Sequence, residues 1–125
     1  MESAKKKILI IEDNEILIAT MQFILEKEGY NLVLAKSGKE GLSLIDEQVI
    51  DLVITDLALP QVHGYEIIDH IRKGEHNKKV PIIIVSGYKD DVSITEGFEV
   101  GADDYIKKPL SPAELISRVR LRMHA

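Results

Sequence analysis

The stretch Leu52-Val-Ile-Thr55 is followed at once by an acidic residue, Asp56. Its side chains are apolar or β-branched and do not alternate with polar ones, which is typical of a strand buried on both faces. Ile8-Leu-Ile-Ile11 and Ile82-Ile-Ile-Val85 have the same character. We therefore expect these runs to form the centre of a parallel sheet.

Two further runs of mixed polarity, Asn31-Leu-Val-Leu-Ala35 and Asp104-Tyr-Ile-Lys107, suit the edges of that sheet. Segments with helical spacing lie between and after the strands, at residues 14–28, 38–47, 64–74, 91–100 and 112–123. Gly29, Ser37 and Ser111-Pro112 stand at helix boundaries that such residues favour. A strict alternation of five strands and five helices predicts an α/β fold, a doubly wound parallel sheet covered on both faces.

Composition limits the classes of function. The chain has 125 residues, which is the size of one domain. Its net charge of −5 gives no reason to expect direct binding of nucleic acid. It has no cysteine, so thiolate chemistry is excluded. The apolar run at residues 8–11 is too short for a signal peptide, and no run would span a membrane. We expect a soluble, cytoplasmic protein. The four histidines lack metal-ligand spacing and are read as surface residues: His63, His70, His76 and His124.

Polar residues follow the central strands and the last strand at their carboxyl ends: Glu12-Asp13, Asp56, Ser86 and Lys107-Lys108. Because the carboxyl ends of parallel strands meet at one edge of a doubly wound sheet, these side chains should lie close together. Crowded carboxylates repel one another unless a cation intervenes, and an all-oxygen ligand set suits Mg²⁺. A carboxylate beside Mg²⁺, an ammonium and a hydroxyl is equipped to accept a phosphoryl group.

Four stretches, taken in order, resemble the response-regulator receiver family, and the resemblance covers residues 6–123. They are Ile8-Leu-Ile-Ile-Glu-Asp13, Asp51-Leu-Val-Ile-Thr-Asp-Leu-Ala-Leu-Pro60 with Gly64, Pro81-Ile-Ile-Ile-Val-Ser86, and Gly101-Ala-Asp-Asp-Tyr-Ile-Lys-Lys-Pro109. The resemblance implies a flavodoxin-like (βα)₅ fold with strand order 2-1-3-4-5 and one receiver domain over residues 1–125, with its core at about 6–123.

The resemblance also implies roles for the acidic residues. Asp56 would accept the phosphoryl group, and Asp13 would bind Mg²⁺ directly. Glu12 would assist, often through water, and the backbone carbonyl of Ala58 would be a further ligand.

For the remaining site residues, the family places its phosphate-binding lysine directly before a proline. This indicates Lys108 rather than Lys107, with a cis peptide between Lys108 and Pro109. Ser86 would be the hydroxyl donor, and Tyr105 the aromatic residue that moves inward on activation.

Three positions depart from the commonest family pattern. His63 replaces the frequent aspartate before Gly64, and Ala58 and Tyr88 stand where side chains are expected to flank the phosphoryl group. Our hypothesis is that Ala58 and Tyr88, which lack an acid or an amide to guide water, set the lifetime of the phosphate.

The function implied is that of a phosphoacceptor, not an enzyme acting on other substrates. A sensor histidine kinase or phosphotransfer protein would phosphorylate Asp56, and the fourth helix, fifth strand and fifth helix, at about residues 91–123, would then bind an effector or a second copy. One alternative is an interaction module that works without phosphorylation. Another is a Mg²⁺-dependent aspartyl-phosphate phosphatase, which would need Asp-x-Asp where the chain has Asp56-Leu57-Ala58.

Overall fold

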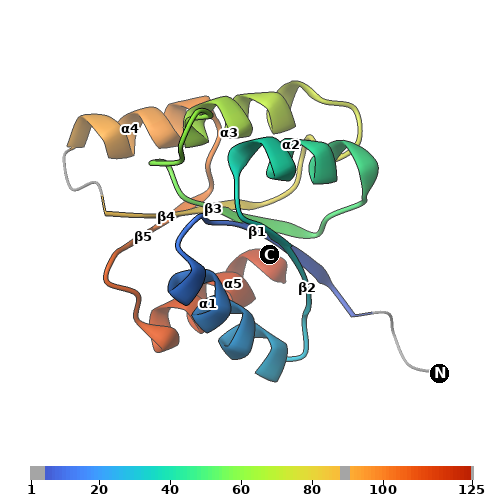
Figure 1. Cartoon of the computed structure of the whole chain (residues 1–125), viewed down its shortest axis with the longest axis vertical. Coiled ribbons are helices and arrows are strands. Elements are labelled where there is room, and N and C mark those ends of the chain that lie inside the picture. The colour runs from blue at the N-terminus through green and yellow to red at the C-terminus, as the bar shows by residue number, and fades with distance from the viewer. Residues whose placement is uncertain (1–4, 88–90, 125) are drawn as a thin grey trace.

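The structure, a computed structural model, describes residues 5–87 and 91–124, with backbone only at 91–93. Strands and helices alternate along the whole of this part of the chain (Figure 1). The strands are β1 (Lys7–Ile11), β2 (Asn31–Ala35), β3 (Leu52–Thr55), β4 (Ile82–Ser86) and β5 (Asp104–Lys107). The helices are α1 (Glu15–Lys27), α2 (Gly38–Glu47), α3 (Gly64–Lys73), α4 (Asp91–Val100) and α5 (Pro112–Met123).

All neighbouring strands are parallel and lie in the order β2-β1-β3-β4-β5. This confirms the α/β fold class and the strand order. The runs with continuous apolar character are the central strands, and the two runs of mixed polarity are the edges. Figure 1 shows α1 and α5 on one face of the sheet and α2, α3 and α4 on the other.

The central strands supply both halves of the core because successive side chains point to opposite faces. Leu9 and Ile11 pack with the α2–α3 side, whereas Ile8 and Ile10 pack with the α1–α5 side. All four of these side chains are fully buried. Because both faces of the central strands are packed, their interior is almost entirely apolar, and the acidic residues Glu12, Asp13 and Asp56 come directly after the strands β1 and β3, at their carboxyl ends.

The helix boundaries follow the local signals in the sequence. The hydroxyls of Ser37 and Ser111 accept the backbone N–H groups of Glu40 and Glu114, and Gly29 takes a φ of 95° after α1. The first helix begins one residue later than expected, because Asn14 is its N-cap: the Asn14 side chain accepts Leu17 N–H at 2.9 Å. None of the helices in the described ranges has the length and apolar character needed to cross a membrane.

Candidate metal and phosphoacceptor site

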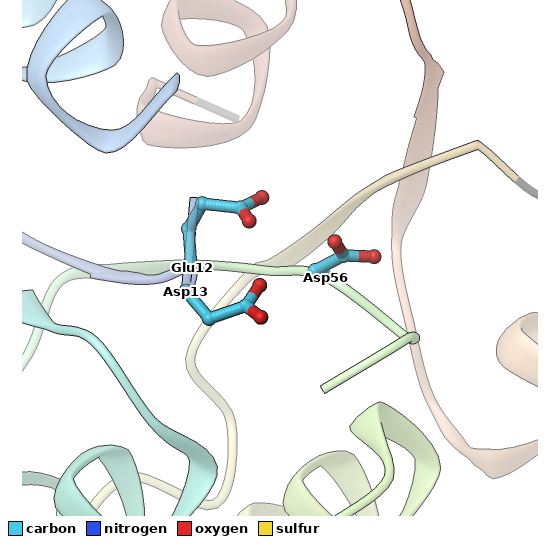
Figure 2. Close-up of side chains that lie close together, drawn as sticks. All are labelled: Glu12, Asp13 and Asp56. Atoms are coloured by element: carbon cyan, nitrogen blue, oxygen red, sulfur yellow. The ribbon is translucent and has the colours of Figure 1, made fainter. Parts of the chain in front are cut away.

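Three carboxylates meet at the carboxyl edge of the sheet (Figure 2). Glu12 and Asp13 follow β1, and Asp56 follows β3, the strand paired with β1. One ligand oxygen from each of the three lies within 4.8 Å of the others. This confirms the expectation that the carboxyl ends of the strands bring these three side chains close together.

Glu12 carries the clearest sign of electrostatic stress at the site. Its side chain is 1% exposed, and Oε1 has no hydrogen-bond partner, although Oε2 accepts Asn14 N–H at 3.0 Å. Burial, followed by the charge of Asp56, raises the pKa of Glu12, and the contacts with Asn14 and Lys108 only partly offset this. The buried carboxylate thus lacks part of the positive charge it needs.

Lys108 provides some of that charge. Its Nζ lies 2.7 Å from Asp56 Oδ2 and 3.3 Å from Glu12 Oε1. Burial alone would lower the pKa of Lys108, but its hydrogen bond with Asp56 and the charges of Asp56 and Glu12 outweigh burial and raise it. The peptide between Lys108 and Pro109 is cis, as expected, while Lys107 is exposed.

The loop after β3 holds Asp56 in place. Asp56 is 4% exposed, and its Oδ1 accepts the N–H of Ala58 at 3.1 Å. The start of α3 packs against this loop, and Gly64 N–H donates to Leu57 O at 3.0 Å. A Cβ on Gly64 would lie 2.6 Å from Leu57 Cα and would also collide with the carbonyl of Asp56, so only glycine permits this approach.

His63 lies outside the carboxylate cluster and has a structural role that the sequence did not indicate. It is half-buried and is the N-cap of α3, with Nδ1 accepting Tyr65 N–H at 3.1 Å. The aspartate usual at this position in the family can cap a helix through a side-chain oxygen, and the imidazole nitrogen takes over that acceptor. The departure in sequence therefore preserves the local structure.

Ser86 and Tyr105 lie on β4 and β5. Ser86 is fully buried, and its carbonyl accepts Lys108 N–H at 2.9 Å, which ties the lysine to the end of β4. Tyr105 is half-buried against the core on the α3 side and is paired in register with Ile84. Tyr88, the other half of the lifetime hypothesis, lies outside the described residues.

The residues present fit a hard divalent cation. The donors are all oxygens, and the buried Glu12 Oε1 is left without a hydrogen bond beside two other carboxylates. Among the side chains that the structure describes, those of residues 5–87 and 94–124, this is the only grouping of three or more candidate ligands. The side-chain cluster thus supports the three carboxylates as ligands of the expected Mg²⁺ site. That the backbone carbonyl of Ala58 is a further ligand stays a prediction.

The chain belongs to the response regulator receiver domain family, whose profile matches residues 8–120. It is 35% identical to the transcriptional regulatory protein AfsQ1 of Streptomyces coelicolor over 113 residues, which is 90% of this chain and 49% of AfsQ1. The chain spans about half the length of the curated relatives it matches. It is thus a receiver domain of the kind found in two-component response regulators.

Solved structures agree with this assignment. A receiver domain protein from Methanospirillum hungatei matches with a TM-score of 0.90 and 30% identity, over 96% of this chain and 94% of that one. The receiver domain of the sensor histidine kinase PA1611 from Pseudomonas aeruginosa matches with a TM-score of 0.90 and 27% identity, over 98% and 100%. That structure has a magnesium ion coordinated in its active-site cleft.

One residue that shapes the site, Asn14, is the N-cap of α1 rather than its first helical residue. The preference of asparagine for the N-cap position is a signal in the sequence that indicates this. The role of Asn14 in holding Glu12 depends on a contact between backbone and side chain that no spacing rule reveals.

Proposed function

We propose that Asp56 is the residue on which this receiver domain is phosphorylated. The observation that carries the proposal is the contact of Lys108 Nζ with Asp56 Oδ2 at 2.7 Å within a buried cluster of carboxylates. A buried aspartate oriented by Ala58 N–H, with a cation already beside it, is positioned as a nucleophile toward phosphorus. We further propose that residues 1–125 form a single domain with its core at about 6–123.

The donor in this proposal is a phosphohistidine of a sensor kinase or phosphotransfer protein. An Asp56 carboxylate oxygen forms a bond to phosphorus, the bond between phosphorus and the histidine nitrogen breaks, and the released imidazole takes up a proton. Lys108 then faces the phosphoryl oxygens, and the Ser86 hydroxyl donates to another of them. Most of the rate comes from this positioning and charge neutralisation.

Mg²⁺ would be held by the carboxylates of Glu12, Asp13 and Asp56 and by the carbonyl of Ala58. When bound, it would neutralise part of the crowded negative charge and of the charge on the transferring phosphoryl group. A bound cation would stabilise the Glu12 carboxylate in particular, because its buried Oε1 has no hydrogen bond.

The donor must dock beside the site, which we expect to happen in the cytoplasm. An exposed apolar side chain is available there: Ile16, in the first turn of α1, is 81% exposed and lies three residues after Asp13. We propose that the donor contacts this side chain when it docks.

The output in this proposal is a change on the face formed by α4, β5 and α5. A phosphoryl group adds charge and acceptor oxygens that keep Lys108 beside Asp56, draw the Ser86 hydroxyl toward it and favour an inward position of Tyr105. That face would then bind an effector or a second copy of the chain. No direct binding of nucleic acid by this domain is proposed.

An enzyme acting on other phosphate esters is the weaker candidate. A phosphatase of that kind needs a second acid two residues after the nucleophile, and the chain has the exposed methyl group of Ala58 there. We therefore propose a signalling phosphoacceptor that catalyses only its own phosphorylation and dephosphorylation.

The test is intact-mass spectrometry after incubation with acetyl phosphate and Mg²⁺. Wild type should gain one phosphoryl group, and Asp56→Asn should gain none. Lys108→Met should gain it much more slowly, whereas Lys107→Met, the matched neighbour, should behave like wild type. Phosphorylation of Asp56→Asn at the wild-type rate would overturn the assignment, and an unmodified wild type would favour the phosphorylation-independent module.

A further inference from the structure

Arg72, in the last turn of α3, binds two other segments of the chain. Its Nε and Nη2 donate to the carbonyl of Gly101 at 3.0 and 2.7 Å, and Nη1 donates to the carbonyls of Lys78 and Val80 at 3.0 and 2.6 Å. Nη2 also pairs with Asp103 Oδ2 at 2.9 Å. Only the planar fork of a guanidinium can meet acceptors in this many directions, so a lysine could not replace it.

Gly101 is shaped to receive this side chain. It ends α4 with a φ of 122°, while Gly101 N–H bonds to Phe98 O at 3.1 Å and Ala102 N–H to Gly97 O at 3.0 Å. This is the Schellman arrangement of a helix C-terminus. A Cβ on Gly101 would lie 2.9 Å from both Cγ and Nε of Arg72, so glycine serves the backbone conformation and the approach of the arginine together.

Asp103 extends the same connection to the sheet. Its Oδ2 accepts Ile82 N–H at 2.8 Å, and its own N–H donates to Ile82 O at 2.8 Å. Ile82 begins β4, so the turn between α4 and β5 is joined both to α3 and to the amino end of β4. We name the set of Arg72, Gly101 and Asp103 the Arg72 clamp.

The clamp and the candidate phosphorylation site lie at opposite ends of the sheet. The candidate site lies at the carboxyl ends of β3, β4 and β5, where Asp56, Ser86 and Lys108 are found. The clamp contacts the amino ends of β4 and β5. Near the clamp, α4 also lies tightly on the sheet, because a Cβ on Gly97 would be 2.7 Å from Ile84 Cδ1. The α4 helix is therefore fastened at the end that is remote from the phosphate.

We propose that the Arg72 clamp keeps the C-terminal end of α4 in place in both phosphorylation states, so that the output face changes by a pivot about Gly101. Movement is then confined to the part of α4 nearest Ser86. Arg72 is a positioning residue of the switch, and this inference rests on the proposed function.

Hydrogen–deuterium exchange of the full chain, with and without Mg²⁺ and the phosphate mimic beryllofluoride, tests the pivot. In wild type, the mimic should alter exchange in peptides covering 86–97 and leave 98–104 unchanged. In Arg72→Met, residues 98–104 should exchange faster without the mimic, and the change caused by the mimic should spread into them. Lys73→Met, the exposed neighbour on the same helix, should match wild type.

Two results would overturn the pivot. One is a response at 98–104 in wild type as large as that at 86–97, and the other is unaltered exchange at 98–104 in Arg72→Met. If Arg72→Met does not fold, Arg72→Lys takes its place, with partial loss of protection at 98–104 expected and full protection contradicting the clamp. Absence of any response in the Asp56 peptide would instead refute the proposed function, and a response there with movement at 98–104 would refute the pivot alone.

Discussion

Glu12 is buried and ionisable, and its raised pKa means that its charge costs stability when no metal is bound. The cost is present above the pKa of Glu12 in the folded protein and disappears as the pH falls through that value. We therefore predict that Glu12→Gln raises the unfolding free energy in EDTA at neutral pH by about 1 kcal/mol. The gain should shrink as the pH falls toward 4.5, the ordinary value for glutamate.

Chemical denaturation in EDTA across this pH range measures the gain, and a repeat with Mg²⁺ supplies the control. Added Mg²⁺ should stabilise wild type more than Glu12→Gln, because the variant has lost a carboxylate from the cluster. A variant less stable than wild type in EDTA at neutral pH would show that the Lys108 contact at 3.3 Å outweighs the burial of Glu12.

Ala58 bears on the lifetime of the phosphate. Its methyl group is exposed two residues after Asp56 and cannot orient water. We predict that Ala58→Asn shortens the lifetime several-fold, because an amide at this position can hold a water molecule near phosphorus. Decay of the phosphorylated mass in Mg²⁺ measures this, and equal half-lives for variant and wild type would rule the hypothesis out.

At the scale of elements, the junction between β3 and α3 sets the position of Asp56. A methyl group on Gly64 would press on the backbone of Asp56 and Leu57, and backbone cannot rotate away. We predict that Gly64→Ala costs about 1–3 kcal/mol of stability, as overpacking does, and slows phosphorylation by acetyl phosphate.

Thermal unfolding of Gly64→Ala beside Gly87→Ala checks this prediction. A Cβ on Gly87 would meet nothing within 4 Å, so that variant should unfold within a few degrees of wild type. Equal melting temperatures for the two variants would mean that the start of α3 shifts without strain.

The elements themselves were accessible from the sequence because each depends on local pattern. Continuous β-branched runs marked the central strands, and Ser37 and Ser111 marked helix starts. Hydrogen bonds between polar side chains and distant segments have no comparable signal in the sequence. Asn77, in the loop before β4, accepts Ile50 N–H at 3.0 Å and donates to the carbonyls of Ile45 and Gln48, yet nothing near it in sequence points to α2.

The same distinction applies to the site in the whole molecule. Strand ends and family motifs predicted which side chains form the cluster, because the strand order alone brings these strand ends to one edge of the sheet. The side chains are those of Glu12, Asp13, Asp56 and Lys108. The strand ends and motifs could not reveal that Arg118 and Arg122 both pair with the buried Asp104, at 2.6 and 3.2 Å. Those contacts depend on how α5 is rotated against β5, which the composition of an arginine-rich helix does not specify.

For the whole molecule, the face of α4, β5 and α5 that we propose as the output face carries an exposed apolar side chain. Phe98 of α4 is 45% exposed. We predict that beryllofluoride with Mg²⁺ increases the fraction of dimer in size exclusion, and that Phe98→Asp abolishes the increase. Ile16→Asp, on the opposite face of the sheet, should leave dimerisation intact and slow transfer from a kinase. Equal dimerisation by wild type and Phe98→Asp would exclude this face.

The position of the phosphoryl group on the chain shows whether Asp56 is the phosphoacceptor. After reaction with acetyl phosphate and Mg²⁺, borohydride reduction of the acyl phosphate followed by peptide mass spectrometry marks the modified residue. We expect the mark on Asp56 alone, in the peptide that contains residues 52–60. A mark on Asp13 or Glu12, or none at all, would contradict it.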